Sequence, residues 1–384
     1  MPGLGAAHRA ARPPRTLRHL DSAAAGRSST AVLDAVAAHT RREAEAGGYV
    51  AAAEAAGVLD GGRAAVRALL GWDASGHGDG HGGGHEGSVA WTHSAHDALL
   101  HVLLARPGGP PRTVLRARGE YGPNLTLLAS VGASAPALPA PDAPGPHRLD
   151  PADLAAALRA RRPDLVHLTW LGSHAGTVQP VPELVAVCAR AGVPVVVDAA
   201  QALGHLDVRL PLTGDLAGAD VVVYATSRKW LAGPRGVGLV AASPGSAWRG
   251  RLGDRSEGHV AGRVGLAAAL AEHLALGPER VRAGLAAVGR AVREGLADVP
   301  GWTVVEDAAE PSATVTLRPD RDDVDVLAVR ARLLAEHGTV TTAAARERAP
   351  EEMTRDVLRV SGHLDTTAGD VAALAAALTA VTGR

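Results

Sequence analysis

The 384-residue sequence is poor in several residue types, and each shortage excludes a class of protein. Its one cysteine, Cys188, excludes a disulfide framework and any zinc site built from cysteines. No apolar run reaches the ~18 residues that a membrane-spanning helix needs. The 39 basic and 40 acidic residues give a net charge of −1, so no excess of positive charge favours nucleic acid or an anionic membrane as a partner.

Lysine is the most informative shortage. Of the 39 basic residues only Lys229 is a lysine, although lysine is normally among the commonest residues. Arginine can replace lysine in salt bridges, but its guanidinium stays protonated and is no nucleophile, whereas a primary amine can form a Schiff base. The composition therefore indicates a catalytic amine at Lys229, and the alternative is that one basic residue remained a lysine by chance.

From residue 88 onward, predicted strands alternate with predicted helices, which indicates an α/β fold with a mostly parallel sheet. The runs at 193–199 and 220–225 are apolar without alternation, as in strands covered on both faces. Residues 239–243 are expected to return antiparallel after a glycine-rich turn. The Asp150–Pro151 pair predicts a helix start.

Three regions are expected along the chain. Residues 1–19 are Arg-rich without the apolar segment of a secretory signal, which predicts a disordered leader and a cytoplasmic protein. Residues 20–250 are expected to form the large domain, with 20–60 partly packed on the smaller one. Residues 251–384 carry two Ala/Leu-rich helices and several short strands, which predict a compact C-terminal domain.

Asp198 closes one predicted strand, and Lys229 follows shortly after the end of the next. Ligands bind at the carboxyl ends of strands in open α/β sheets. Burying a carboxylate costs several kcal/mol of desolvation free energy unless another group pairs with it. A pyridinium nitrogen is one such partner, and this pairing makes pyridoxal an electron sink. The two residues together predict a pyridoxal phosphate site. The alternative for Asp198 alone is a cap on the following turn.

Phosphate requires hydrogen-bond donors, and two segments offer them. Ser94, Ala95 and His96 open the helix after a predicted strand, where free backbone amides and the helix dipole attract an anion. Thr226 and Arg228 add a hydroxyl and a guanidinium next to the lysine. Together these residues predict the seat of a 5′-phosphate.

A Gly/His tract at 75–87 could suggest a metal site, with four histidines in or near it: His77, His81, His85 and His93. The glycines provide no rigid scaffold and no cysteine is nearby, so the spacing is not specific for a metal. We interpret the tract as a solvated insertion.

Several segments, namely HLDSAAAGRSS, GEYGPN, DAAQALGH and DVVVYATSRKWLAGPRGVG, resemble class V aminotransferases, the cysteine desulfurase-like branch of fold-type-I pyridoxal phosphate (PLP) enzymes. The resemblance runs from about residue 18 to 380. PDLVHLT, EAGGYVAA and ATSRKWLAGPRGVG are most similar to the subgroup of C–S lyases that act on hercynylcysteine sulfoxide in ergothioneine biosynthesis. The resemblance to class V aminotransferases implies a PLP-dependent fold-type-I homodimer with its active site near the interface.

The resemblance also implies roles for individual residues. Lys229 would bind PLP covalently, Asp198 would pair with its pyridine nitrogen and Gln201 would contact its phenolic oxygen. Tyr121 stands where the family has a histidine that stacks on the ring, and Ser173 where it has an asparagine. Residues expected to contact the substrate are Arg359, which would grip the carboxylate, and Asn124, Tyr49 and Ser22.

The single cysteine narrows the reaction. A cysteine desulfurase needs a mobile thiol, and Cys188 lies in a predicted core helix. A β-lyase needs no thiol, and a sulfoxide sulfur is a good leaving group, so we expect β-elimination that yields ergothioneine, pyruvate and ammonia. Another class V reaction, such as transamination, epimerisation or desulfuration, remains an alternative, as does a non-catalytic PLP-binding dimer.

Overall fold

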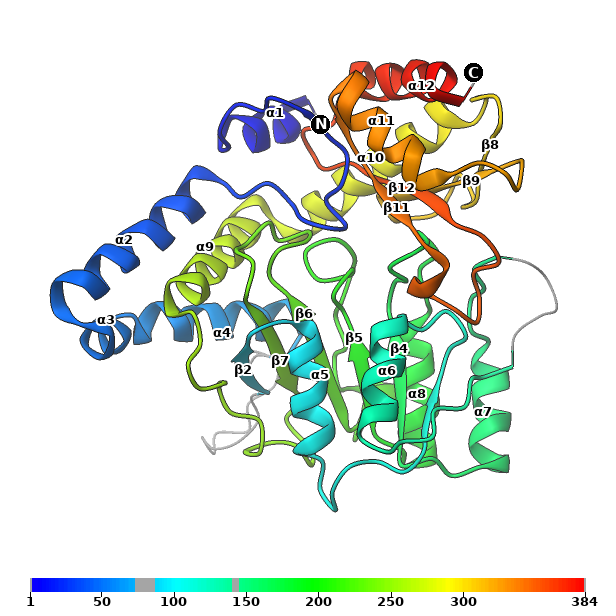
Figure 1. The fold of residues 1–384 in the computed structure, drawn as a ribbon. Helices are drawn as coiled ribbons and strands as arrows, with labels where there is room; N and C mark the ends of the chain where they lie inside the picture. Colours follow the sequence, from blue (N-terminus) through cyan, green and yellow to red (C-terminus); the bar gives the residue numbers. More distant parts are fainter. Residues whose placement is uncertain (1, 73–86, 140–144, 383–384) are drawn as a thin grey trace.

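The computed structural model describes residues 2–72, 87–139 and 145–382. These residues form a large domain around a six-stranded sheet and a smaller domain above it (Figure 1). The Gly/His tract predicted to be a solvated insertion lies, apart from Gly87, outside the described residues.

The six-stranded sheet is mostly parallel, as predicted. Its order is β2-β7-β6-β5-β4-β3, and β3 to β6 run parallel to one another, while β7 is antiparallel to both of its neighbours. The strands are β2 (Ser88–Thr92), β3 (Val114–Arg116), β4 (Leu165–Thr169), β5 (Val195–Asp198), β6 (Val221–Thr226) and β7 (Gly238–Ala242). The predicted antiparallel return at 239–243 is thereby confirmed.

Helices cover both faces of this sheet, which explains the strands without polar alternation. Val195 and Val197 of β5 join one apolar core, whereas Val196 between them joins the core on the opposite face. One face is covered by α5 (Ala95–Leu104) and α6 (Gly122–Ser130). The other is covered by α4 (Ala56–Leu70), α7 (Pro151–Ala160), α8 (Val181–Ala191) and α9 (Val260–Leu276). Asp150 caps α7 as predicted, accepting a hydrogen bond from the Ala152 amide.

The smaller domain has its own core. Its antiparallel sheet has the order β11-β12-β9-β8, and the strands are β8 (Trp302–Val304), β9 (Thr314–Pro319), β11 (Thr342–Ala344) and β12 (Val357–Ser361). The 3₁₀ turn η2 (Arg346–Arg348) lies between β11 and β12. Three helices share the apolar core of this sheet, namely α10 (Pro278–Leu296), α11 (Val326–His337) and α12 (Ala368–Thr382).

The division between the domains lies later than the expected residue 250. Leu266 and Leu270 of α9 belong to the core of the large sheet. Helix α9 also packs against α4 and α2 (Thr30–Ala46), which continues into α3 (Gly48–Glu54). The chain bends by 86° between α9 and α10. The small domain therefore starts at α10, since the apolar side chains of α9 are buried against the large domain.

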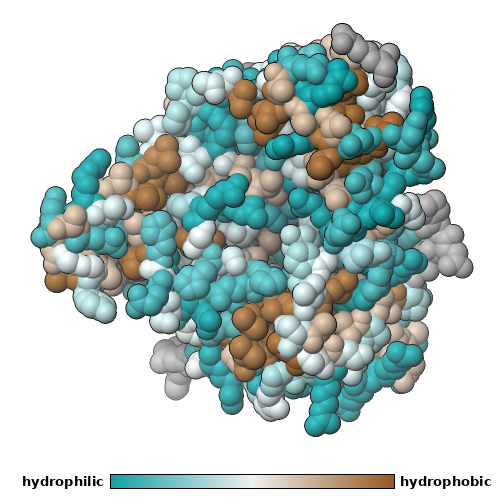
Figure 2. Space-filling view, in the orientation of Figure 1, coloured by the Kyte–Doolittle hydropathy of each residue, from teal (hydrophilic) through white to brown (hydrophobic). Residues whose placement is uncertain are grey.

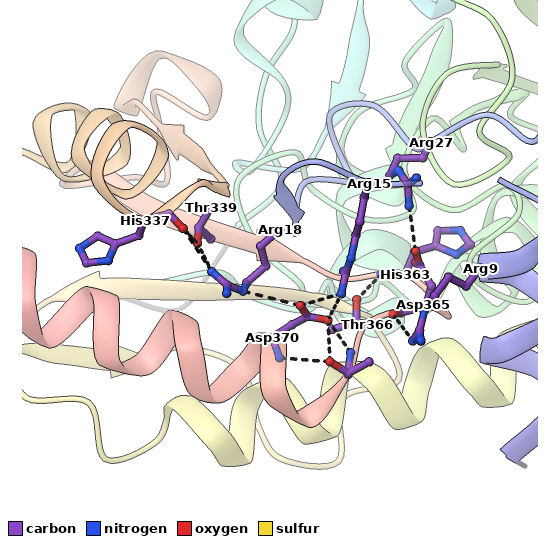
Figure 3. A network of polar contacts seen from close by, with 11 residues as sticks. Arg9, Arg15, Arg18, Arg27, His337, Thr339, His363, Asp365, Thr366 and Asp370 are labelled. Carbon is purple, nitrogen blue, oxygen red and sulfur yellow. Dashed lines mark hydrogen bonds and ion pairs between the residues drawn. The ribbon is translucent and has the colours of Figure 1, made fainter. Parts of the chain in front are cut away.

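The expected disorder of residues 1–19 is wrong. Pro2–Ala10 form helix α1, and β1 (Arg18–His19) pairs in parallel with β10 (Thr339–Val340) of the small domain. Ion pairs anchor the segment to the C-terminal region, as Figure 3 shows: Arg15 bonds Asp370 at 2.9 Å. Sequence periodicity did not reveal this order because the partners lie more than 300 positions away.

Among the described residues, no single helix is long and apolar enough to cross a membrane. The bent pair α9–α10 passes such a test only when its two helices are taken together. Apolar side chains of both helices belong to buried cores.

Candidate active site

A cavity of about 410 Å³ lies at the carboxyl ends of β4, β5 and β6, between the two domains. The strand ends contribute Thr169, Asp198 and Thr226 to its wall, and Lys229 follows β6 by three residues. Arg348 of η2 reaches the cavity from the small domain. The predicted site at this edge of the sheet is therefore a real concavity.

Asp198 is 8% exposed, and donors from the protein surround its carboxylate. Oδ1 accepts the Ala200 amide at 2.7 Å, and Oδ2 accepts the Tyr224 hydroxyl at 3.0 Å. The Asn124 amide lies 3.4 Å from the same Oδ2. Because its bonds run across the sheet to Tyr224 as well as to its own turn, Asp198 is more than a turn cap.

Lys229 lines the cavity with an amine that is easily deprotonated. Burial lowers the pKa of Lys229 to about 7, against the opposing effect of Asp198. The positive charges of Arg228, Arg359 and Arg348 lower this pKa further. A substantial fraction of the amine is therefore neutral and nucleophilic near neutral pH.

The residues of the predicted phosphate seat come together in the cavity wall, namely Ser94, Ala95, His96, Thr226 and Arg228. Ser94 is the N-cap of α5 and accepts the Asp97 amide. A Cβ on Gly238 would lie 2.5 Å from the Ser94 carbonyl carbon, so the glycine allows this helix start to approach the sheet. The Arg228 guanidinium also donates to the Ala24 carbonyl, which fixes it at the rim.

Four further predicted residues line the cavity: Tyr121, Asn124, Ser173 and Gln201. Gln201 is held from two sides, because its Nε2 donates to the Ala23 carbonyl at 3.0 Å and its Oε1 accepts the Trp230 indole at 3.2 Å. Asn124 is 3% exposed and donates to Glu120 at 2.9 Å. Its amide thus serves the wall behind the cavity, and its predicted substrate contact stays untested.

Three predicted substrate residues do not line the cavity. Arg359 is 1% exposed and already bonded, donating to the Ser173 carbonyl at 2.5 Å and the Thr342 hydroxyl at 3.2 Å. Ser22 is buried beside the small-domain sheet, where its amide bonds Ser361. Tyr49 is 94% exposed on α3, outside the site of its own chain. Because α3 packs on α2 and α4, Tyr49 does not reach the cavity of its own subunit, and its substrate contact stays a prediction.

Four residues at the site were not expected from the sequence: Arg348 in the cavity wall, and Glu120, His167 and Tyr224, which are buried behind Asp198. Arg348 gave no signal because arginine is abundant and its segment has no motif. His167 and Tyr224 are lone polar residues inside apolar strands. That interruption is the signal that could have found them.

The polar groups that line the cavity, both donors and acceptors, fit PLP. One side offers a carboxylate for a pyridine nitrogen, and another offers a helix N-terminus, a hydroxyl and a guanidinium for a phosphate. The lone amine, with its lowered pKa, lines the same cavity. This donor set matches the three polar features of one cofactor.

The lowered pKa of Lys229 can be measured directly because it is the chain's only side-chain amine. Labelling of the apoprotein with a neutral amine-directed reagent, read by peptide mass spectrometry, should reach half its maximal rate at about pH 7. The Arg348→Ala variant removes one repelling charge and should shift this midpoint upward. A rate that still rises toward the ordinary pKa of 10.5 would contradict the described burial.

The chain is similar to several known proteins. Residues 132–248 match the family described as Aminotransferase class-V. A probable hercynylcysteine sulfoxide lyase of Mycobacterium tuberculosis is 47% identical over 390 residues, covering 97% of this chain and 92% of the relative. Among solved structures, a cystine C–S lyase, C-DES, complexed with cysteine persulfide has a TM-score of 0.77 at 20% identity, covering 95% of this chain and 97% of its own. The cysteine desulfurase CsdA of Escherichia coli has a TM-score of 0.74 at 20% identity and covers 99% and 98%, so these two structures show the shared fold. With a donor set for PLP around its only lysine and a near-full-length relative, the chain belongs to the class V aminotransferase family of PLP-dependent enzymes.

Proposed function

We propose that this protein is a PLP-dependent C–S lyase that cleaves a cysteine S-conjugate by β-elimination, with hercynylcysteine sulfoxide as its substrate. One observation carries the reaction type: the cavity holds a reactive amine, and no thiol lines it. The relative of 47% identity, named as a probable lyase for that sulfoxide, supports the substrate.

Side chains of the cavity are suited to two tasks of the reaction, which are removing the Cα proton and holding PLP. PLP supplies an electron sink for the Cα of a bound amino acid, which favours loss of the Cα proton. Lys229, with a pKa near neutrality, is the base placed to take that proton at Nζ. Asp198 would hold the pyridine ring of the cofactor, and Thr226 and Arg228 would hold its phosphate.

Cys188 is not available as a sulfur acceptor. It is fully buried in α8, and burial raises the pKa of its thiol to about 12. Sulfur therefore leaves on the product rather than on the enzyme. Breaking the Cβ–S bond of a sulfoxide releases a sulfenate, while the three-carbon fragment takes up water and leaves as pyruvate and ammonia. Conversion of that sulfenate to the thiol ergothioneine consumes a two-electron reductant.

The reaction is tested by incubating the PLP-loaded enzyme with hercynylcysteine sulfoxide and measuring pyruvate and ammonia. Wild-type enzyme and Cys188→Ala should release both at similar rates. Lys229→Ala should be slower by about a thousandfold or more, since it lacks both the base and the covalent anchor.

Other outcomes separate the alternatives. Alanine and persulfide from cysteine, lost in Cys188→Ala, would identify a desulfurase instead. Cofactor absorption without turnover of the sulfoxide would redirect the search to other amino acids or to a non-catalytic dimer. Absence of cofactor absorption after incubation with PLP would refute the assignment of Lys229 and Asp198.

Arg348 is proposed to bind an anionic end of the substrate. Hercynylcysteine sulfoxide carries a carboxylate on each of its two amino-acid moieties, and the Arg348 side chain lines the cavity. Because a charged hydrogen bond is lost, Arg348→Ala should raise KM roughly tenfold or more, with a smaller effect on kcat. The matched control, Arg346→Ala, removes an exposed arginine of the same 3₁₀ turn and should leave KM unchanged. Equal effects of the two substitutions would contradict a specific contact.

We further propose a homodimer formed through the arm of α2 and α3, because the arm exposes apolar side chains (Figure 2). Leu33 is 47% exposed, Tyr49 94% and Val50 49%. In such a dimer Tyr49 would serve the partner's site rather than its own. Analytical ultracentrifugation should give twice the chain mass of 38.9 kDa. Tyr49→Asp should weaken the dimer, whereas Leu327→Asp, at a 64% exposed position of α11, should not. A monomer in the wild type would refute the proposal.

A further inference from the structure

A chain of buried polar side chains leads from Asp198 into the large domain. Glu120, His167 and Tyr224 are each 0% exposed. His167 Nδ1 lies 2.7 Å from Glu120 Oε2, and His167 Nε2 lies 2.9 Å from the Tyr224 hydroxyl. That hydroxyl in turn donates to Asp198 Oδ2 at 3.0 Å. The carboxylate at the cavity is thus connected to a second carboxylate that no solvent reaches.

The topology of the sheet brings these groups together. His167, Asp198 and Tyr224 belong to the adjacent parallel strands β4, β5 and β6, and Asp198 pairs in register with Tyr224. Tyr224 packs in the core beneath α5 and α6, and side chains alternate between the two faces of each strand. Glu120 enters from the segment that precedes α6. The network therefore belongs to the buried centre of the domain.

Glu120 is surrounded by donors. Its carboxylate accepts hydrogen bonds from the Tyr121 amide, the Asn124 amide, the His167 ring and the Thr169 hydroxyl. Burial alone would raise the pKa of Glu120, but the His167 charge and these hydrogen bonds outweigh it and lower the value to about 2. Burial likewise opposes the charge on His167, and Glu120 overcomes it to raise the pKa of the imidazole. The two side chains form a buried ion pair.

The charge on His167 decides which way the Tyr224 hydroxyl points. With Nδ1–H donated to Glu120 and a second proton on Nε2, the ring donates to the Tyr224 oxygen. The hydroxyl hydrogen is then free for Asp198. Burial and the negative charges of Asp198 and Glu120 raise the pKa of Tyr224, so the hydroxyl keeps this hydrogen. A neutral His167 would instead accept that hydrogen and deprive Asp198 of the bond.

We propose that Glu120, His167 and Tyr224 are positioning residues that hold Asp198 as an anion facing the cavity, through one directed hydrogen bond from Tyr224. An anionic Asp198 favours the protonated pyridine nitrogen of PLP, which is the form that withdraws electrons best. The inference rests on the part of the proposed function that concerns PLP, because it requires that PLP binds at this site. It does not require any particular substrate.

The first test compares cofactor binding in two variants. Tyr224→Phe keeps the ring in the core and removes the hydroxyl, so PLP should bind the apoprotein roughly tenfold more weakly or worse. Ser243→Ala is the matched control, because it removes a buried hydroxyl that bonds Val221 at the opposite end of β6. The control should leave the cofactor dissociation constant unchanged. Unaltered binding in Tyr224→Phe would overturn the proposal.

A cofactor analogue separates an electronic effect from a structural one. In 1-deazapyridoxal phosphate a carbon replaces the ring nitrogen, so no proton can be shared with Asp198. The difference between wild type and Tyr224→Phe should disappear with this analogue. If Tyr224→Phe weakens binding of PLP and of the analogue equally, the hydroxyl has only a structural role and the proposal fails.

A double-mutant cycle tests whether Glu120 and His167 act through Tyr224. Glu120→Gln should weaken PLP binding by itself but add little in the Tyr224→Phe background, because the bond it supports is already gone. Fully additive effects on the dissociation constant would refute the directed chain. Wild-type protein that binds no PLP at all would instead refute the cofactor assignment, so the two failures are distinguishable.

Discussion

The buried carboxylate of Asp198 is the constraint on which most of the site depends. Removing such a charge from water costs several kcal/mol unless donors replace the lost solvation. Here the turn after β5 gives one amide and the neighbouring strand β6 gives one hydroxyl. Asp198 also lines the cavity, where a pyridinium nitrogen would complete the solvation of its carboxylate. The same carboxylate therefore bonds neighbouring elements of the fold and lines the proposed cofactor site.

Both domains contribute positively charged side chains around the amine of Lys229. Lys229 and Arg228 follow β6 in the large domain, whereas Arg348 and Arg359 come from the small domain. Their mutual repulsion, together with burial, keeps the amine of Lys229 reactive. The relative position of the two domains thus affects the chemistry as well as the shape of the cavity. The N-terminal segment links the two domains, because β1 pairs with β10 of the small domain and the Gly26 amide bonds the Arg228 carbonyl of the large one.

Ion pairs of arginine side chains connect segments that are far apart in the sequence. Asp370 in the first turn of α12 and Asp365 just before this helix bind arginines of the N-terminal segment, namely Arg15, Arg18 and Arg27 (Figure 3). Arg116 likewise reaches Glu351, which lies just beyond the 3₁₀ turn that carries Arg348. Arginine can serve all of these pairs, so losing lysine elsewhere costs little. At position 229 an amine has chemistry that a guanidinium lacks.

The sequence by itself determined the parallel sheet, the role of Lys229 as the lone amine and its association with Asp198. These follow from local facts: apolar runs, strand ends and one residue type that occurs once. Only the tertiary structure showed the order of the N-terminal segment, the enclosure of Arg359 and the exposure of Tyr49, because each depends on contacts between distant segments. The hydrogen-bonded network from Glu120 to Asp198 was likewise shown only by the tertiary structure. A strand buried on both faces carries no polar alternation, so its sequence does not tell which face His167 or Tyr224 occupies. The register of three adjacent strands decided that.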